Sequence, residues 1–433
     1  MSDKKVAFYT LGCKLNFSES SSLVNEFVKR GYKKVEFSEV ADVYVVNTCS
    51  VTSMADKKSR YSIRTAIKNS DNSIVAVIGC YSQLKPQEIA KIEGVDIILG
   101  TKDKFKIFDY LSNIEKGKTI IQSCEIDDVD NFESAYSIDE RTRSFLKIQD
   151  GCDYKCAYCT IPLARGKSRN STIESIYKQA LEIEERGFKE IVITGINIGD
   201  FGKSTNENFY QLLLKLENLQ KIKRIRISSV EPNLMTTEII QLVKNSEKYL
   251  PHFHIPLQSG TNEILAKMQR RYTSEFFANK ISEIKLILPQ AFIGIDVIVG
   301  FPGETDELFE KTYNFINNLD ISFLHIFPYS ERANTKSAVL NNKIGSKTIN
   351  LRVQTLKQIS DNKHNQFYMQ NIGKHSKVLF ESTVHQGKIC GYTENYIQVE
   401  TDFDQELINQ IKPVKLLEIN KNGSMKIEIM NFK

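Results

Sequence analysis

The chain has 433 residues, 41% of them hydrophobic and 26% charged, which is enough to bury a core in two or three domains and excludes a fold that depends on disulfides. With no apolar leader and no apolar run of membrane-spanning length, its eight cysteines predict a reducing, cytoplasmic setting and no membrane partner. The net charge of +5 permits a polyanionic partner such as RNA without requiring one.

Along the first hundred residues, short β-rich runs alternate with helical patterns. Strands are expected within residues 5–12, 41–49, 73–80 and 95–100, and this alternation is typical of a parallel α/β sheet. Residues 123–142 are polar, acidic and weakly periodic. We therefore expect an N-terminal domain over residues 1–122 that is followed by a linker.

A second series of six β-rich runs begins at Ser144. Helical stretches follow the first five runs, which predicts a (β/α)6 barrel or part of one over residues 143–350, with its chemistry at the C-terminal strand ends. A helix over 351–372 would connect this barrel to a small all-β module over 373–433. The six runs lie within residues 144–150, 189–195, 222–229, 251–257, 292–299 and 321–327.

Three cysteines of the first series, Cys13, Cys49 and Cys80, each follow a predicted strand. The C-terminal ends of parallel strands lie at one edge of a sheet, so these thiols are expected to converge there. Ordinary buried cysteines are the alternative, because free cysteine is among the most buried residue types.

A second triplet, Cys152, Cys156 and Cys159, lies in the short stretch "GCDYKCAYC". A structural zinc site normally takes four protein ligands, and no fourth cysteine or histidine lies near this loop. Three thiolates on a four-iron cluster would leave one iron open, and a substrate or cofactor could bind there.

The CxxxCxxC spacing, the aromatic Tyr158 and the place of the loop after the first strand of a six-strand series resemble the radical S-adenosylmethionine (SAM) superfamily. With the first triplet added, the chain resembles the methylthiotransferases of that superfamily over nearly its whole length. "GCKLN" and "NTCSVT" are most similar to the MtaB class, which acts on threonylcarbamoyladenosine beside the tRNA anticodon. The motifs that carry the resemblance are "TLGCKLNFSES", "VVNTCSVT", "VIGCYSQ", "SSVEP", "HFHIPLQSG", "DVIVGFPGET" and "FPYSER".

The resemblance implies two [4Fe-4S] clusters, one on each cysteine triplet, and two molecules of SAM. The cluster at the 152–159 loop would bind SAM and cleave it to a 5′-deoxyadenosyl radical, while the auxiliary cluster on the first triplet would carry the sulfur. One SAM would methylate that sulfur. The other would serve to remove hydrogen from C2 of N6-threonylcarbamoyladenosine at position 37 of tRNA, which becomes its 2-methylthio derivative.

The same resemblance implies the partners. These are the tRNA anticodon stem-loop and an electron donor such as flavodoxin or ferredoxin. The C-terminal module resembles the TRAM domain, an RNA-binding β-barrel, although its basic and acidic residues are balanced and give no separate support for RNA binding.

Four residues outside the triplets are candidates for cofactor binding. Gly195 follows the second strand of the second series, where the missing Cβ can let a nucleoside approach. Glu231 and Gln258 end the third and fourth strands, where a barrel presents its ligand contacts, and Arg165 can bind a carboxylate or phosphate with two nitrogens. A plain strand-end turn is the alternative for Gly195, and exposed polar loop positions are the alternative for Glu231 and Gln258.

Other polar residues have structural interpretations. Arg169 can share the anion contact of its neighbour or be solvated at the surface. His252 and His254 point the same way on a strand, and we expect them to pack rather than to bind a metal. We expect Cys124 and Cys390, which have no cysteine neighbours, to bind no metal.

The helical stretch after Cys49 carries a basic face and an apolar face. A basic face directly behind a cluster cysteine suits contacts with phosphates, and a solvated helix surface is the alternative. The four cations of this face are Lys57, Arg60, Arg64 and Lys68.

Three rival functions stay open at this point. The same chemistry could act on isopentenyladenosine in tRNA or on a ribosomal-protein aspartate. A non-catalytic iron–sulfur or RNA-binding protein would not cleave SAM. A radical SAM enzyme could also hold zinc, as a structural ion, at the first triplet.

Overall fold

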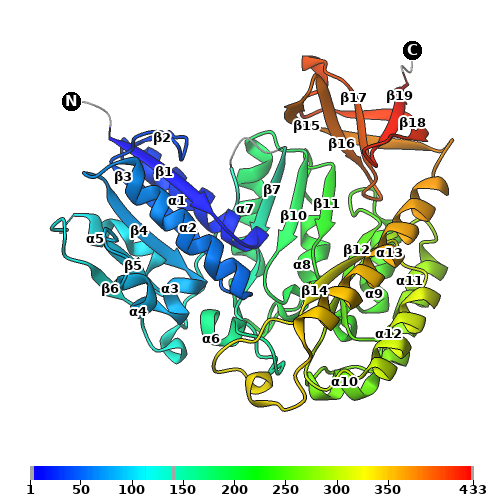
Figure 1. The fold of residues 1–433 in the computed structure, drawn as a ribbon. Helices are drawn as coiled ribbons and strands as arrows, with labels where there is room; N and C mark the ends of the chain where they lie inside the picture. Colours follow the sequence, from blue (N-terminus) through cyan, green and yellow to red (C-terminus); the bar gives the residue numbers. More distant parts are fainter. Residues whose placement is uncertain (1–3, 113, 139–141, 431–433) are drawn as a thin grey trace.

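The computed structural model describes residues 4–112, 114–138 and 142–430. Residues 1–3, 113, 139–141 and 431–433, which fall in the expected first domain, linker and last domain, lie outside the described residues. Figure 1 shows three parts in chain order: a parallel sheet domain in blue to cyan, an open barrel in green to yellow, and a small barrel in orange to red. The predicted fold class is confirmed.

The N-terminal sheet has six parallel strands in the order β2-β1-β3-β4-β5-β6. Because side chains alternate along a strand, Val43 and Val45 of β3 pack under α1 and α5, while Tyr44 and Val46 pack under α2 and α4. The strands are β1 Lys5–Thr10, β2 Lys33–Val35, β3 Val43–Thr48, β4 Ile74–Gly79, β5 Ile97–Leu99 and β6 Ile120–Gln122, and the helices are α1 Lys14–Lys29, α2 Ser53–Asn69, α3 Cys80–Leu84, α4 Pro86–Ala90 and α5 Ile107–Leu111.

The central part is a half barrel of six parallel strands. Strands β7, β10 and β11 form one sheet and β12, β13 and β14 another, and two parallel bridges between residues of the β11 and β12 segments join them. The strands are β7 Arg143–Lys147, β10 Glu190–Thr194, β11 Arg224–Ile227, β12 His252–Gln258, β13 Phe292–Val299 and β14 Phe323–Pro328.

Helices cover the outer face of the half barrel, and the alternation of each strand sorts its residues. Ile225 of β11, Ile255 of β12 and Ile293 of β13 belong to the large apolar core under these helices. Their neighbours in sequence face inward, into the space that we call the lumen. The helices are α7 Ile173–Glu185, α8 Phe209–Leu216, α9 Thr237–Asn245, α10 Asn262–Lys267, α11 Ser274–Ile287 and α12 Asp306–Asn318.

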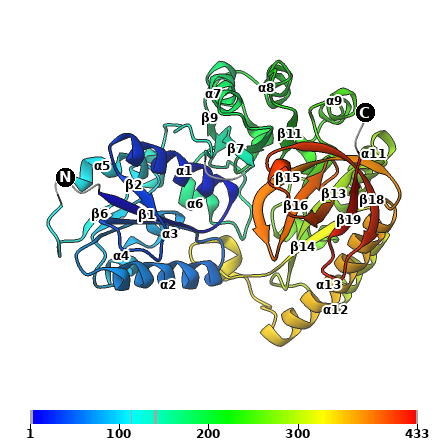
Figure 2. The same cartoon turned by 90° about the horizontal axis from the view of Figure 1, so that it is seen from above.

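The C-terminal part begins after α13 (Ser346–Met369), which packs against β14, and it is a closed five-stranded barrel in the order β15-β16-β17-β19-β18. Arg224, the first residue of β11, donates to the carbonyls of Tyr392 at 2.9 Å and Lys377 at 2.5 Å. The small barrel therefore lies against the N-terminal ends of the half-barrel strands (Figure 2). Its strands are β15 His375–His385, β16 Lys388–Thr393, β17 Gln398–Asp402, β18 Ile411–Ile419 and β19 Met425–Ile429.

A buried ion cluster joins the N-terminal domain to the half barrel. Glu19 of α1 is fully buried and accepts from Lys104 at 2.6 Å, Lys147 at 3.0 Å and Arg165 at 3.1 Å. Asp150 pairs with Lys147 and Arg165, each at 2.9 Å. Two carboxylates from different parts of the chain thus share the cations of Lys147 and Arg165, and Glu19 also pairs with Lys104.

The pKa of Glu19 reports how strongly these charges interact. Burial alone would raise it, but Arg165, Lys104 and Lys147 together hold the pKa of this carboxyl well below its ordinary value of 4.5. A lowered folded-state pKa stabilises the fold at neutral pH. This contribution is lost as the pH falls below the ordinary carboxyl value.

No helix within the described ranges is both long and apolar enough to cross a membrane.

We expect Glu19→Ala to lower the free energy of unfolding by about 3–5 kcal/mol, because it leaves buried cations without their carboxylate. Urea unfolding of the variant and the parent chain measures the difference. The control is Glu26→Ala, which removes a half-exposed pair with Arg30 at 3.0 Å and should change the free energy by less than about 1 kcal/mol. Equal losses in the two variants would contradict the role given to Glu19.

Candidate functional site

The first cysteine triplet lies at one edge of the N-terminal sheet. Cys13 caps α1 just after β1, Cys49 follows β3, and Cys80 opens α3 directly after β4. These three strands are neighbours in the parallel sheet, so their C-terminal ends bring the thiols to the same edge. The convergence expected from the sequence is therefore present in the fold.

Two glycines allow the segments at this edge to pack closely together. Gly12 has φ +102°, and a Cβ on it would lie 2.9 Å from the Cβ of Cys49 and 3.1 Å from its Sγ. Gly79 has φ +100°, and a Cβ there would lie 2.5 Å from Oδ1 of Asn47. Both positions need the left-handed backbone and the missing side chain of glycine.

The second triplet lies in the loop between the short strand β8 (Gln149–Asp150) and α6 (Ile161–Arg165), near the C-terminal end of β7. Each sulfur accepts one hydrogen bond. The donors are the backbone N–H of Tyr154 for Cys152 at 3.4 Å, Nη1 of Arg270 for Cys156 at 3.1 Å and the backbone N–H of Ile161 for Cys159 at 3.4 Å. The loop thus holds three sulfurs in fixed directions.

Burial raises the pKa of Cys49, Cys152 and Cys159 to about 12 in each case. The free thiols are therefore protonated at neutral pH, and a metal that binds them must displace their protons.

Each cysteine triplet offers ligands of the kind that an iron–sulfur cluster takes. Cysteine thiolates bind the iron corners of a [4Fe-4S] cluster one by one, so three of them leave one iron without a protein ligand. Throughout the described residues, the one set of three or more His, Cys, Asp or Glu side chains with ligand atoms all within 4.8 Å of one another is His254, Asp296 and His325.

One cavity of about 250 Å³ adjoins the second triplet and the segment that follows Cys49. Its wall includes Val51 and Thr52, which follow Cys49, and Cys159 itself. Asp296 and Gln258 line the side toward the half barrel. A ligand in this cavity would therefore contact Cys159 and lie near the segment that follows Cys49.

Two of the predicted cofactor residues lie close to the second triplet. Gln258 lines the cavity, follows a register shift in β12 and has φ +68°, a backbone conformation that is unfavourable for a residue with a side chain and that often occurs at functional sites. Glu231 forms an ion pair with Arg270, the donor to Cys156. Arg270 was not expected from the sequence, because no motif marks it.

The other two predicted cofactor residues have protein neighbours instead. The space beside Gly195 is filled, since a Cβ there would lie 2.8 Å from Ile198 and 2.9 Å from the carbonyl oxygen of Gln149. Arg165 is 1% exposed and donates to Asn16 at 2.6 Å as well as to the buried ion cluster. Its terminal nitrogens are thus engaged within the protein.

Of the remaining polar residues, His252 has the packing role that was expected, whereas Arg169 and His254 differ from expectation, since His254 pairs with Asp296 at 2.8 Å. Arg169 is buried and donates to the carbonyls of Arg165 at 2.6 Å and Asn131 at 2.8 Å, so a solvated surface position is wrong for it. His252 stacks on Phe292, with ring centroids 5.5 Å apart, as the packing interpretation requires.

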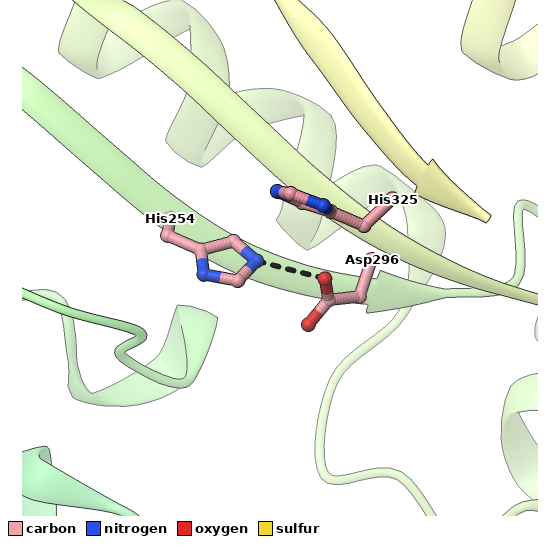
Figure 3. A group of neighbouring side chains, drawn as sticks. All are labelled: His254, Asp296 and His325. Atoms are coloured by element: carbon pink, nitrogen blue, oxygen red, sulfur yellow. Dashed lines mark hydrogen bonds and ion pairs between the residues drawn. The ribbon is translucent and has the colours of Figure 1, made fainter. Parts of the chain in front are cut away.

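Five side chains of the lumen were not expected to act together. His254, Asp296 and His325 come from the neighbouring strands β12, β13 and β14 and point toward one another (Figure 3). Arg226 of β11 faces the same space, and Lys14 reaches it from the start of α1. Burial, together with the nearby charge of Arg226, lowers the pKa of Lys14 to about 8.

The basic face of α2 is smaller than the sequence predicts. Lys57, Arg64 and Lys68 are exposed, as RNA contacts would require. Arg60 instead turns toward the domain, where it donates to the hydroxyl of Tyr81 at 3.0 Å and pairs with Glu88 at 2.9 Å.

Comparisons with known proteins agree with this arrangement. The model of Uncharacterized protein family UPF0004 matches residues 5–100, and that of the radical SAM superfamily matches residues 146–316. The threonylcarbamoyladenosine tRNA methylthiotransferase MtaB of Bacillus subtilis (strain 168) is 40% identical over 426 residues, which are 95% of this chain and 93% of the relative. A tRNA-2-methylthio-N(6)-dimethylallyladenosine synthase of Clostridium botulinum (strain Hall) is 32% identical over 430 residues, which are 95% and 94% of the two chains.

A solved structure shares the fold. The radical SAM methyltransferase TsrM of Kitasatospora setae, with a tryptophan substrate and a SAM analogue bound, superposes with a TM-score of 0.55 at 14% identity. The match covers 78% of this chain and 75% of that one.

We expect Gly12→Ala to reduce the iron that the chain retains after anaerobic reconstitution, because the added Cβ pushes Cys13 and Cys49 apart. Gly31→Ala is the matched control, since Gly31 also has a positive φ, of +86°, but nothing lies within 4 Å of a Cβ built there. Iron quantification on both variants measures the effect. A similar loss of iron in both variants would mean that backbone strain, and not contact with Cys49, causes the loss.

Proposed function

Since this chain belongs to the radical SAM methylthiotransferases of tRNA, we propose that it converts N6-threonylcarbamoyladenosine at position 37 to the 2-methylthio derivative. The enzyme uses SAM and [4Fe-4S] clusters, as its family does. The observation that supports this substrate is a difference in sequence identity. The chain is 40% identical to the MtaB relative and 32% identical to the dimethylallyladenosine synthase, over the same share of this chain.

We assign a separate role to each cysteine triplet in this proposal. Cys152, Cys156 and Cys159 would hold the cluster that binds SAM, and the triplet of the N-terminal sheet would hold the auxiliary cluster. When bound, the first cluster supplies the electron for SAM cleavage and the second the sulfur that is inserted. Each turnover would use two molecules of SAM.

The residues around the cavity position the reactants. Arg270 connects Cys156 to Glu231, which fixes the loop against the third strand end, where the SAM amino acid would lie. Gln258 and Asp296 line the opposite wall and would hold the nucleoside between the two triplets.

Partners and domain limits complete the proposal. A flavodoxin or ferredoxin would deliver the electron. The exposed cations of α2 and the C-terminal barrel would contact the anticodon stem-loop. The domains would comprise residues 1–122, 143–350 and 373–433, with the linker at 123–142 and the connecting helix at 351–372 between them.

Cys156→Ala should abolish the formation of 5′-deoxyadenosine and leave the first triplet able to hold its cluster. Cys49→Ala should keep SAM cleavage and lose the methylthio product. Iron analysis, nucleoside detection and mass spectrometry of the tRNA measure these outcomes, with about eight irons expected for the parent chain when both clusters are complete. Product from Cys49→Ala would exclude a sulfur-carrying role for that triplet.

The substrate itself is tested in cells. Deletion of the gene should remove 2-methylthio-threonylcarbamoyladenosine from the tRNA, as nucleoside mass spectrometry would show. If that nucleoside persists while 2-methylthio-isopentenyladenosine disappears, the substrate proposal is wrong and the chemistry stands.

The triple variant Lys57→Ala, Arg64→Ala, Lys68→Ala should weaken stem-loop binding and reduce its salt dependence, by about two units in the slope of log K against log salt, because three phosphate contacts are lost. Titrations at several salt concentrations measure the slope. Arg60→Ala is the control, since its side chain pairs with Glu88, and it should keep the parent slope. An unchanged slope in the triple variant would remove α2 from the RNA interface.

A further inference from the structure

The lumen of the half barrel carries hydrogen-bond donors that have no acceptor within the protein. In the described residues, the ring nitrogens of His325 have no hydrogen-bond partner, and this side chain is exposed although it faces inward. The ring of His254 lies 5.0 Å from it, centroid to centroid. Two imidazoles on β12 and β14 thus flank the strand between them.

Asp296 and Gly294 of β13 shape the space between the two rings. Oδ1 of Asp296 lies 2.8 Å from Nε2 of His254 and so fixes the orientation of that ring (Figure 3). Gly294 leaves room beside it, since even a Cβ there would come no closer than 3.9 Å to either imidazole. Glycine at this position therefore leaves a gap of about one methyl group beside the two rings, while the other side of His325 packs on Phe323, at 4.9 Å between ring centroids.

Lys14 adds a positive charge that nothing in the described part of the chain neutralises by contact. Its ammonium group is partly buried and has no hydrogen bond or ion pair there. It lies within electrostatic reach of His325 and Arg226. A partly buried cation without a partner is unfavourable unless an anion binds near it.

Arg226 adds a second positive charge to the lumen. It is 1% exposed, and although its Nε pairs with Glu190 at 3.1 Å, both of its terminal nitrogens lack a hydrogen-bond partner among the described residues. Its guanidinium lies over the ring of Tyr396, 4.6 Å from the centroid. The lumen thus contains several unused donors, most of them cationic.

We propose that Lys14, His254 and His325 form an anion subsite that binds the carboxylate of the threonylcarbamoyl group. The assignment rests on the proposed function, because this group carries the carboxylate that a dimethylallyl group lacks. Asp296 lines the cavity beside Cys159, and Lys14 directly follows Cys13. A nucleoside in the cavity can therefore extend its N6 substituent into the lumen.

This subsite explains how one fold could select between two tRNA substrates. A charge-assisted hydrogen bond to the carboxylate favours the threonylcarbamoyl group. An apolar substituent in the same place would leave these donors desolvated and unpaired, which penalises it. A metal ion on His254, Asp296 and His325 is the competing use of these side chains.

The experiment measures binding of fluorescent anticodon stem-loops to the reconstituted enzyme without SAM, so that no turnover occurs. One RNA carries threonylcarbamoyladenosine and the other unmodified adenosine. The parent enzyme should prefer the modified RNA, and the double variant Lys14→Met, His325→Phe should lose about tenfold or more of that preference. His325→Gln, which keeps a donor, should retain part of it.

Two controls accompany these variants. His364→Ala removes a histidine that packs on Tyr368 of α13, at 4.3 Å between ring centroids, and should keep the full preference. Iron content of each variant, equal to that of the parent, shows that the clusters are loaded.

The outcomes separate the subsite from the substrate. If the parent enzyme binds both RNAs equally, the proposed substrate fails and the subsite with it. If the parent prefers the modified RNA and the double variant keeps that preference in full, the subsite is wrong and the substrate stands. If EDTA removes the preference while the iron content stays unchanged, a metal ion rather than the side chains themselves binds the carboxylate, and the proposed direct contact is wrong.

Discussion

Burial of Glu19 between three cations is the interaction on which the arrangement of both cysteine triplets depends. Glu19 lies on the helix that directly follows Cys13, and Arg165 lies on the short helix that follows Cys159. Their contact at 3.1 Å therefore ties the two cysteine-bearing segments together. Because an unpaired charge is costly in a dry interior, the two domains have little freedom to separate while both ions remain buried.

The half barrel is open along one side, and the other domains close it. The N-terminal domain covers the open edge, where Ser18 of α1 donates to the carbonyl of Phe145 in β7 at 3.0 Å. The C-terminal barrel covers the N-terminal strand ends, where Tyr396 packs on His252 at 4.5 Å between centroids. The C-terminal strand ends remain as the side with the cavity, which is where a parallel barrel presents its chemistry.

The convergence of the first cysteine triplet could be predicted from the sequence because it depends on strand order. A cysteine that ends a parallel strand lies at the same edge as any other, so the convergence of Cys13, Cys49 and Cys80 follows from strand order alone. Most strands of the half barrel are recognised from their apolar runs, such as β13 with eight residues. The three-residue strands β2 and β6 are too short to give a periodic pattern.

Contacts between distant parts of the chain could not be predicted in this way. The partner of Arg165 is 146 positions away in sequence, and nothing near Arg165 indicates a buried carboxylate rather than a bound cofactor. The polar lumen can be recognised in the sequence. The stretches "RIRI" and "HFHI" alternate polar and apolar residues, which is unusual for strands that are covered by helices. It means that the inner face of these strands is polar, and polar groups facing inward without partners indicate a ligand rather than a core.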